Sequence, residues 1–216
     1  MKHLIILGAG GFGREVYCSA TESIGYGVDF DIKGFLDPNP NILDGFNGYP
    51  PIIGDDSSYI IEEDDVFICA NGNVRLKQRI CEYMLSRGAS FITLIHKTAY
   101  LSKNTKLGQG CLILAGARIH CDVTIEDFVV VQPYAIVGHD VKIGKWSHIN
   151  ALADCGGMSR IGVGVTLHTT CFVIPGAVVE DYSTVGAGSV TLRRVKAGST
   201  VYGIPAKPIA LPKSNK

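Results

Sequence analysis

Residues 101–190 divide without a gap into fifteen sixes: LSKNTK, LGQGCL, ILAGAR, IHCDVT, IEDFVV, VQPYAI, VGHDVK, IGKWSH, INALAD, CGGMSR, IGVGVT, LHTTCF, VIPGAV, VEDYST and VGAGSV. The first position of each six is aliphatic fourteen times, and the one exception is Cys155. The fifth position never holds a residue larger than valine. Chance spacing does not persist through fifteen repeats, so this repeat sets the fold of the segment.

A period of six residues indicates a solenoid, because it matches neither the 3.6-residue period of a helix nor the two-residue period of a flat strand. Each six provides one short strand and a turn, so three sixes close one triangular coil and residues 101–190 make about five coils. We expect the first position to point into this prism and to stack on its counterpart one coil away. The small fifth position should lie where the chain bends.

Composition excludes several classes of protein. The chain has 216 residues, enough for one or two domains, and its net charge of zero gives no sign of nucleic-acid binding or of a polybasic membrane patch. No apolar run approaches ~18 residues, so we expect no transmembrane helix, and residues 1–7 are too short for a signal peptide. The seven cysteines include no CxxC pair, and free thiols favour a cytoplasmic location.

The residues before the repeat predict a small α/β unit. Apolar runs predict buried strands at 3–7, 33–37, 66–70 and 91–95, with helices from the glycine-rich turn to about residue 24 and from 73 to 87. Strands that alternate with helices indicate a parallel sheet of βαβ units. The change of period divides the chain into an N-terminal domain at 1–97, the solenoid at 98–200 and a tail at 201–216. Residues 202–208 should leave the prism, and 213–216 should fray.

A glycine motif follows the first strand. Gly8, Gly10 and Gly13 fit GxGxxG between a strand and a helix, a geometry that offers backbone N–H groups and a helix N-terminus to a phosphate. Asp37, at the end of the second strand, could hold a ribose hydroxyl. The unit is too short for a full dinucleotide fold, so it suits a nucleoside diphosphate better than NAD. A tight turn without a ligand remains an alternative.

Two histidines in the repeat are candidates for chemistry. His139, the third residue of its six, should point out of the prism, and a histidine beside a carboxylate such as Asp140 can act as a general base. His148 lies nine residues further on, near a corner on a different face, where a ring N–H could bond a thioester carbonyl. Both residues have an alternative interpretation: a solvated surface histidine for His139, and a packed interface histidine for His148. The six histidines show no metal-ligand spacing, so we expect no metal site.

These features together resemble the hexapeptide-repeat sugar acyltransferases of the sialic-acid O-acetyltransferase family, which includes nucleotide-sugar N-acetyltransferases. The resemblance covers nearly the whole chain, from the glycine loop to the GIPAK segment at 203–207. It implies a Rossmann-like mononucleotide-binding domain followed by a left-handed parallel β-helix, and an acetyl-CoA-dependent enzyme of surface-polysaccharide biosynthesis. The acceptor would be the amine of a nucleotide-linked amino sugar, most simply a 4-amino-4,6-dideoxy sugar. The family also implies a homotrimer, with acetyl-CoA in the cleft between neighbouring prisms.

The family's roles can be transferred to matching positions. His139 corresponds to the general base and Asp140 to its acidic neighbour. Positions that match acetyl-CoA contacts are His148, Gly157, Thr169 and Ala187, and positions that match nucleotide-sugar contacts are Gly8, Gly10, Gly11, Phe12, Asp37, Pro38 and Gly72.

The sequence departs from the family pattern at two points. Phe12 replaces a histidine that is frequent in the glycine loop, and Gln132 stands where a relative has asparagine near the sugar. These departures concern the polar contact at the glycine loop, the identity of the nucleotide and the position of the reacting group. O-acetylation of a sugar such as sialic acid, with the same base, is a second hypothesis. A non-catalytic nucleotide-binding scaffold is a third, and an NAD-dependent enzyme is a fourth.

Overall fold

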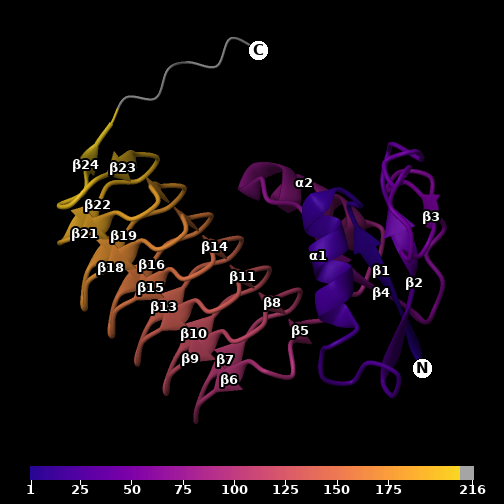
Figure 1. Ribbon diagram of the computed structural model, residues 1–216, viewed down its shortest axis with the longest axis horizontal. Coiled ribbons are helices and arrows are strands. Elements are labelled where there is room, and N and C mark those ends of the chain that lie inside the picture. Colours follow the sequence, from indigo (N-terminus) through magenta and orange to yellow (C-terminus); the bar gives the residue numbers. More distant parts are fainter. Residues whose placement is uncertain (210–216) are drawn as a thin grey trace.

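The computed structural model describes residues 1–209 of the 216. Two parts lie side by side, an α/β unit and a stack of coils whose strands climb in steps away from it (Figure 1). Each coil contributes one strand to each of three sheets, so the solenoid is a three-sided prism.

The strands of the prism are short and evenly spaced. The sheet that faces the α/β unit contains β5 (Leu94–Ile95), β8 (Leu112–Ile113), β11 (Val130–Val131), β14 (His148–Ile149), β17 (Thr166–Leu167), β20 (Thr184–Val185), β23 (Thr200–Tyr202) and β24 (Lys207–Pro208). The second sheet contains β6 (Tyr100–Leu101), β9 (Arg118–Ile119), β12 (Ile136–Val137), β15 (Asp154–Cys155), β18 (Phe172–Val173) and β21 (Val190–Thr191). The third contains β7 (Lys106–Leu107), β10 (Thr124–Ile125), β13 (Lys142–Ile143), β16 (Arg160–Ile161), β19 (Val178–Val179) and β22 (Arg194–Val195).

The interior of the prism confirms the predicted ladder. Its buried apolar cluster runs from Cys111 to Val201, and up to Val185 it consists of residues from the first and fifth positions of the sixes. Partners in neighbouring coils are 18 residues apart, as at Val130 and His148, until the last coil, where Thr184 pairs with Thr200. Each inward side chain therefore stacks on its equivalent in the next coil and is removed from water on all sides.

Every corner of the ladder uses the same backbone conformation. All fifteen residues at the fourth position have φ between +53° and +73°, and ten of them are not glycine. This left-handed conformation closes a tight turn, and Asn and Asp tolerate it better than other side chains that carry a Cβ. The turn leaves the third-position residue, immediately before it, on the outside of the corner.

The N-terminal unit is a parallel sheet between two helices. The strand order is β3 (Ile52–Gly54), β2 (Phe30–Leu36), β1 (Lys2–Leu7) and β4 (Asp65–Cys69). Alternate residues of β1 point to opposite faces: Leu4 and Ile6 pack in the cluster that includes residues of α1 (Gly11–Ala20), whereas Ile5 and Leu7 pack with residues of α2 (Val74–Ser86). The sheet is thus buried on both faces, as its continuous apolar strands require.

The fourth strand of this sheet differs from the prediction. Residues 52–54, for which the sequence predicted no strand, pair with β2 at the sheet edge. The run 91–95 does not join the sheet as a strand, because Leu94 and Ile95 pair with β8 and form the first rung of the prism. Only Phe91 makes an isolated bridge, to Phe67. The coils therefore begin just before the predicted division between residues 97 and 98, which stays a prediction.

An apolar seam joins the two parts. Phe128 stacks on Trp146, with ring centroids 4.3 Å apart and planes 7° from parallel, and it meets Phe91 edge-on at 5.0 Å. From α2, Cys81 and Met84 pack in the same cluster. The first coils of the β5–β24 face are thus covered by the N-terminal unit, and the other two faces of the prism are not part of this seam.

The tail does not leave the prism at 202–208, as the sequence suggested. It turns back, so that β24 pairs antiparallel with β23 and the Ala206 amide donates to the Val190 carbonyl at 2.8 Å. Ala206 packs against the end of the inner core, because a prism that stopped at β23 would expose its last layer of apolar side chains. The predicted fraying at 213–216 lies outside the described residues.

Candidate active site

His139 lies on the corner between β12 and β13. Its Nδ1 is 2.7 Å from Oδ2 of Asp140, and the two side chains are 55% and 57% exposed. The backbone explains why the pair forms: Asp140 occupies the left-handed corner position at φ +58°, and its amide donates to the Cys121 carbonyl one coil back. The carboxylate holds Nδ1 as a donor, which leaves Nε2 as the lone-pair nitrogen available to accept a proton.

Gly157 lies next to this ring because it is one coil, or 18 residues, further along the same corner. A Cβ at position 157 would be 2.5 Å from His139 Nε2 and 2.9 Å from Cδ2 and Cε1. Because Gly157 has no side chain, the imidazole ring of His139 can lie against its backbone, with Nε2 directly over the glycine. The Gly157 amide has no backbone acceptor among the described residues.

His148 occupies a different environment. It belongs to β14 on the covered face, is 2% exposed, and its Nε2 has no hydrogen-bond partner in the described structure. Burial, and secondly the nearby Lys77 ammonium, lower the pKa of His148 well below its usual range. Lys77 is itself 1% exposed, donates to the Phe128 carbonyl at 2.7 Å, and has its pKa lowered by burial to about 8. Within one chain His148 is a neutral seam residue and does not face His139.

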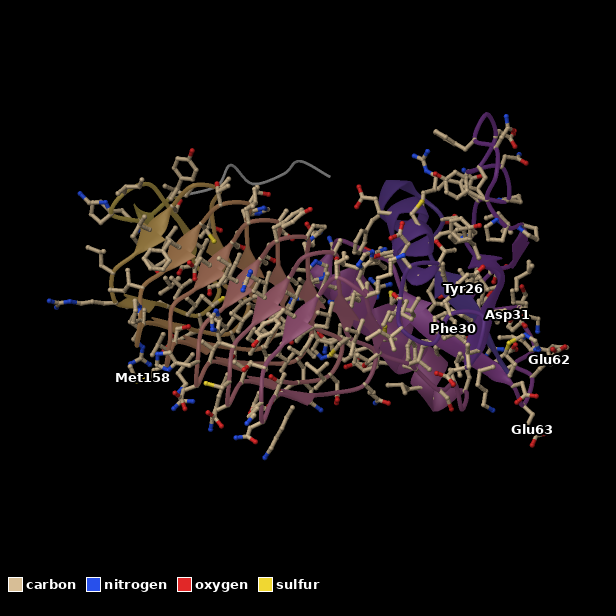
Figure 2. All side chains as sticks on the ribbon, turned by 60° about the horizontal axis from the view of Figure 1, so that its bottom comes forward. Tyr26, Phe30, Asp31, Glu62, Glu63 and Met158 are labelled. Atoms are coloured by element: carbon tan, nitrogen blue, oxygen red, sulfur yellow. The ribbon has the colours of Figure 1, made fainter. Side chains whose placement is uncertain are left out.

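The other two predicted coenzyme positions lie on a third part of the surface. Thr169 and Ala187 occupy equivalent turns, between β17 and β18 and between β20 and β21. They share the edge between the β5–β24 face and the β6–β21 face. His139 and Gly157 instead share the edge opposite the N-terminal unit, and Met158, which donates its amide to the His139 carbonyl, is on the outer side of the solenoid in Figure 2. A single chain therefore brings His139 and Gly157 together but separates them from Thr169 and Ala187.

The glycine loop forms the predicted strand-to-helix turn. Gly8 has φ +99°, and a Cβ on Gly13 would strike the Gly8 carbonyl, so both glycines are required by the turn itself. In contrast, a Cβ on Gly10 would meet nothing within 4 Å, and on Gly11 it would only reach the end of Arg14. The N-cap Gly10 has no side-chain cap. The backbone at the start of α1 is therefore open to an anion.

Asp37 forms hydrogen bonds within the protein in addition to its predicted contact with a ribose hydroxyl. Its Oδ2 accepts the Ala9 amide at 2.9 Å and its Oδ1 accepts the Asn39 amide at 3.0 Å. The carboxylate thus ties the glycine loop to the turn after β2, and it keeps lone pairs for a ribose hydroxyl.

A hollow of about 540 Å³ lies at the carboxyl ends of the strands. Gly8, Asp37 and Pro38 line it together with Arg79 and Tyr83 of α2. This is the edge at which open α/β sheets bind ligands. Sequence reasoning missed Arg79 and Tyr83, although their four-residue spacing on a predicted helix would place them on one side of it. Gly72 lines a separate hollow between α2 and the prism, and Gly11 lines another beside α1.

Residues 1–209 contain no group of three or more His, Cys, Asp or Glu side chains arranged to hold a metal ion. Within the same range, no helix has the length and apolar character needed to cross a membrane.

Known proteins share both parts of this fold. Residues 3–84 match the family model of the PglD N-terminal domain. The acetyltransferase domain of PglB from Neisseria gonorrhoeae has the same fold, with a TM-score of 0.87 and 31% identity over 97% of this chain and 100% of that one. This chain belongs to the hexapeptide-repeat sugar N-acetyltransferases. Its fold is the predicted Rossmann-like domain followed by a left-handed parallel β-helix, and it is an acyltransferase.

The names of two relatives include a substrate. GDP-perosamine N-acetyltransferase of Escherichia coli O157:H7 is 27% identical over 94% of both chains. PerB from Caulobacter crescentus, solved with CoA and GDP-perosamine, is 27% identical with a TM-score of 0.88 over 97% of this chain and 98% of that one. A further structure of the Neisseria domain contains acetyl coenzyme A.

Proposed function

We propose that this enzyme transfers the acetyl group of acetyl-CoA to the amine of a nucleotide-linked amino sugar, with His139 as the general base. The observation that carries the proposal is the His139–Asp140 pair, which is open to solvent and has Nε2 over the bare backbone of Gly157. The glycine loop and the hollow beside Asp37 suit the nucleoside diphosphate. A 4-amino-4,6-dideoxy sugar is the expected acceptor, and a cytoplasmic location stays a prediction.

The reaction needs no covalent enzyme intermediate. His139 Nε2 takes a proton as the sugar nitrogen attacks the thioester carbonyl, and the oxyanion that develops can be met by a backbone amide such as that of Gly157. Collapse of the tetrahedral intermediate breaks the C–S bond. The proton on Nε2 then passes to the departing CoA thiolate, so that the base returns to its starting state. While Nε2 carries the proton, Asp140 stabilises the imidazolium.

The separation of the predicted residues supports a homotrimer with composite sites. The edge that carries His139 and Gly157 lies away from the chain's own nucleotide hollow, whereas the edge that carries Thr169 and Ala187 borders the face on which the N-terminal unit sits. We propose that His139 from one subunit meets the coenzyme edge and the nucleotide of its neighbour. The β6–β21 face between these edges carries outward apolar residues suited to such contact, including Tyr100, Ile136, Phe172 and Val190.

The activity can be tested with UDP-, dTDP- and GDP-linked 4-amino sugars and acetyl-CoA, with free thiol as the readout. We expect turnover with one nucleotide series, no turnover with the free sugar, and a kcat reduced about 10²–10⁴-fold in His139→Ala. Turnover that persists in this variant would remove His139 from the mechanism. Acetylation of a free sialic acid instead would favour the O-acetyltransferase hypothesis.

The composite site can be tested by mixing subunits. His139→Ala and a variant that blocks the glycine loop, Gly10→Trp, should each be inactive, because each removes one half of every site. Co-expressed together with different affinity tags, they should form mixed trimers in which some sites combine an intact corner with an intact loop. Activity that returns in the doubly purified species supports the proposal. A monomeric mass by light scattering, or no recovery in a verified mixed trimer, contradicts it.

A further inference from the structure

A hollow of about 340 Å³ lies where the start of α2 faces the later coils of the prism. Arg75 and Gly72 line it from the N-terminal unit, and Thr166, His168, Tyr182 and Thr184 line it from the solenoid. Thr166 and Thr184 are partners in adjacent strands, so their hydroxyls belong to one face, one coil apart.

Arg75 is held in place at this hollow. Its guanidinium carbon is 3.5 Å from the centroid of the Tyr182 ring, and the Tyr182 hydroxyl donates to Oε1 of Gln78, one turn further along α2, at 3.1 Å. No carboxylate of the described residues forms an ion pair with Arg75. Stacking on an aromatic ring fixes the plane of the guanidinium, and the donors on its edge remain available for an oxyanion.

The hollow at Arg75 differs from the other hollows in the charge of the residues that line it. Each of four other hollows in the described part of the chain contains at least one carboxylate, such as Asp37, Glu22, Glu180 or Asp122. The hollow at Arg75 contains a guanidinium, an imidazole and two threonine hydroxyls, and no acidic residue. Gly72 leaves its backbone open, because a Cβ there would meet nothing within 4 Å. Donors without competing carboxylates are what a phosphate group requires.

We propose that this hollow binds a phosphate group of one of the two substrates, with Arg75 as its charged partner and with His168, Thr166 and Thr184 as further hydrogen-bond donors. The inference rests on the proposed function, which supplies two phosphate-bearing substrates. The group is either a phosphate of the coenzyme, whose predicted contact Thr169 follows His168 directly, or the diphosphate of the nucleotide, whose predicted contact is Gly72. The site spans the seam between the two domains, so binding there links the two domains directly.

The test compares Arg75→Gln and Thr184→Val with the wild type in steady-state kinetics, varying acetyl-CoA and the nucleotide sugar in turn. We expect Arg75→Gln to raise the KM of one substrate about tenfold or more while kcat stays within about twofold, because a charge-assisted bond to the phosphate is lost. Thr184→Val should raise the same KM by a smaller factor. The substrate whose KM changes identifies the source of the phosphate, and acetyl-dephospho-CoA distinguishes the 3′-phosphate of the coenzyme from its diphosphate.

Controls separate the site from the fold and from the proposed activity. Arg160→Gln removes an exposed arginine from the β7–β22 sheet, which does not border the hollow, and should leave both KM values unchanged. Calorimetry with inorganic pyrophosphate on the full chain should show binding to the wild type that Arg75→Gln weakens. If both KM values stay within about twofold in Arg75→Gln and Thr184→Val, the inference is wrong. If the wild type transfers no acetyl group, the proposed function fails, and the pyrophosphate titration alone then decides this inference.

Discussion

Replacing Gly157 with alanine should disable the proposed base, His139, without unfolding the prism. The added Cβ would be 2.5 Å from His139 Nε2, about 1 Å inside an ordinary contact of ~3.5 Å. The ring must therefore move by about that amount, and its 2.7 Å contact with Asp140 must lengthen or break. A displacement of ~1 Å at a catalytic group can lower the rate about 10²-fold. We expect kcat to fall roughly 10²-fold, with a thermal midpoint within a few degrees of the wild type, because the new methyl lies outside the core.

A double-mutant cycle tests this reasoning. In a His139→Ala background the obstructed ring is absent, so the further change of Gly157 to alanine should have little effect on the residual rate, and the two changes should be far from additive. Additive losses in kcat would refute the argument, since they would mean that the methyl group acts on something other than the His139 ring. A normal kcat in the single Gly157→Ala variant would refute it more directly. Urea unfolding of all three variants provides the control for stability.

Three further predictions concern the seam and the proposed catalytic pair. The unfolded chain keeps the Lys77 proton up to about pH 10.5, whereas the folded chain releases it near pH 8. The free energy of unfolding of the wild type relative to Lys77→Met, from urea titrations, should therefore rise by roughly 1 kcal/mol per pH unit between these values, and a constant difference would contradict it. Phe128→Ala, which removes a 3% exposed ring stacked on Trp146, should lower stability by about 3–5 kcal/mol in the same assay. Asp140→Asn should lower kcat roughly 10²-fold or more at an unchanged thermal midpoint, because the imidazolium of His139 loses its counter-charge; an unchanged kcat would show that the pair is only structural.

The sequence predicted the prism well because each inward position is repeated many times and is set by local packing. The same repeat also implies a contact at the candidate site that was not predicted. His139 and Gly157 are 18 residues apart and share the third position, so a three-sided coil must place them in contact. The left-handed corners were not recognised, because the fourth position holds ten residues other than glycine, among them Phe128 and Leu152, and has no common side chain.

The sequence left open, or did not reveal, features that depend on docking between segments. It offered a packed interface histidine as one of two interpretations of His148, and the structure shows His148 packed because α2 lies over the β5–β24 face. Its neighbour in the sheet, Thr166, holds the equivalent position one coil on and is only half-buried, because it lies at the hollow beside α2. Likewise the run 91–95 is apolar enough for either domain, and pairing with β8 decides where it goes.

Helix α2 contacts both the hollow beside Asp37 and the prism. Arg79 and Tyr83 line the nucleotide hollow, Lys77 and Met84 are buried in the seam, and Arg75 stacks on Tyr182 of the solenoid. The hollow beside Asp37 is therefore joined to the prism through a helix that is held by apolar packing in the seam and by the hydrogen bond from the Lys77 ammonium to the Phe128 carbonyl. A rigid seam would matter for the proposed composite site, because there the acceptor amine has to reach His139 of another subunit. In the proposed trimer the coils set the position of His139, and α2 sets the position of the hollow beside Asp37 relative to the coils. A change at the seam should thus alter the distance between the sugar and the base even though it touches neither.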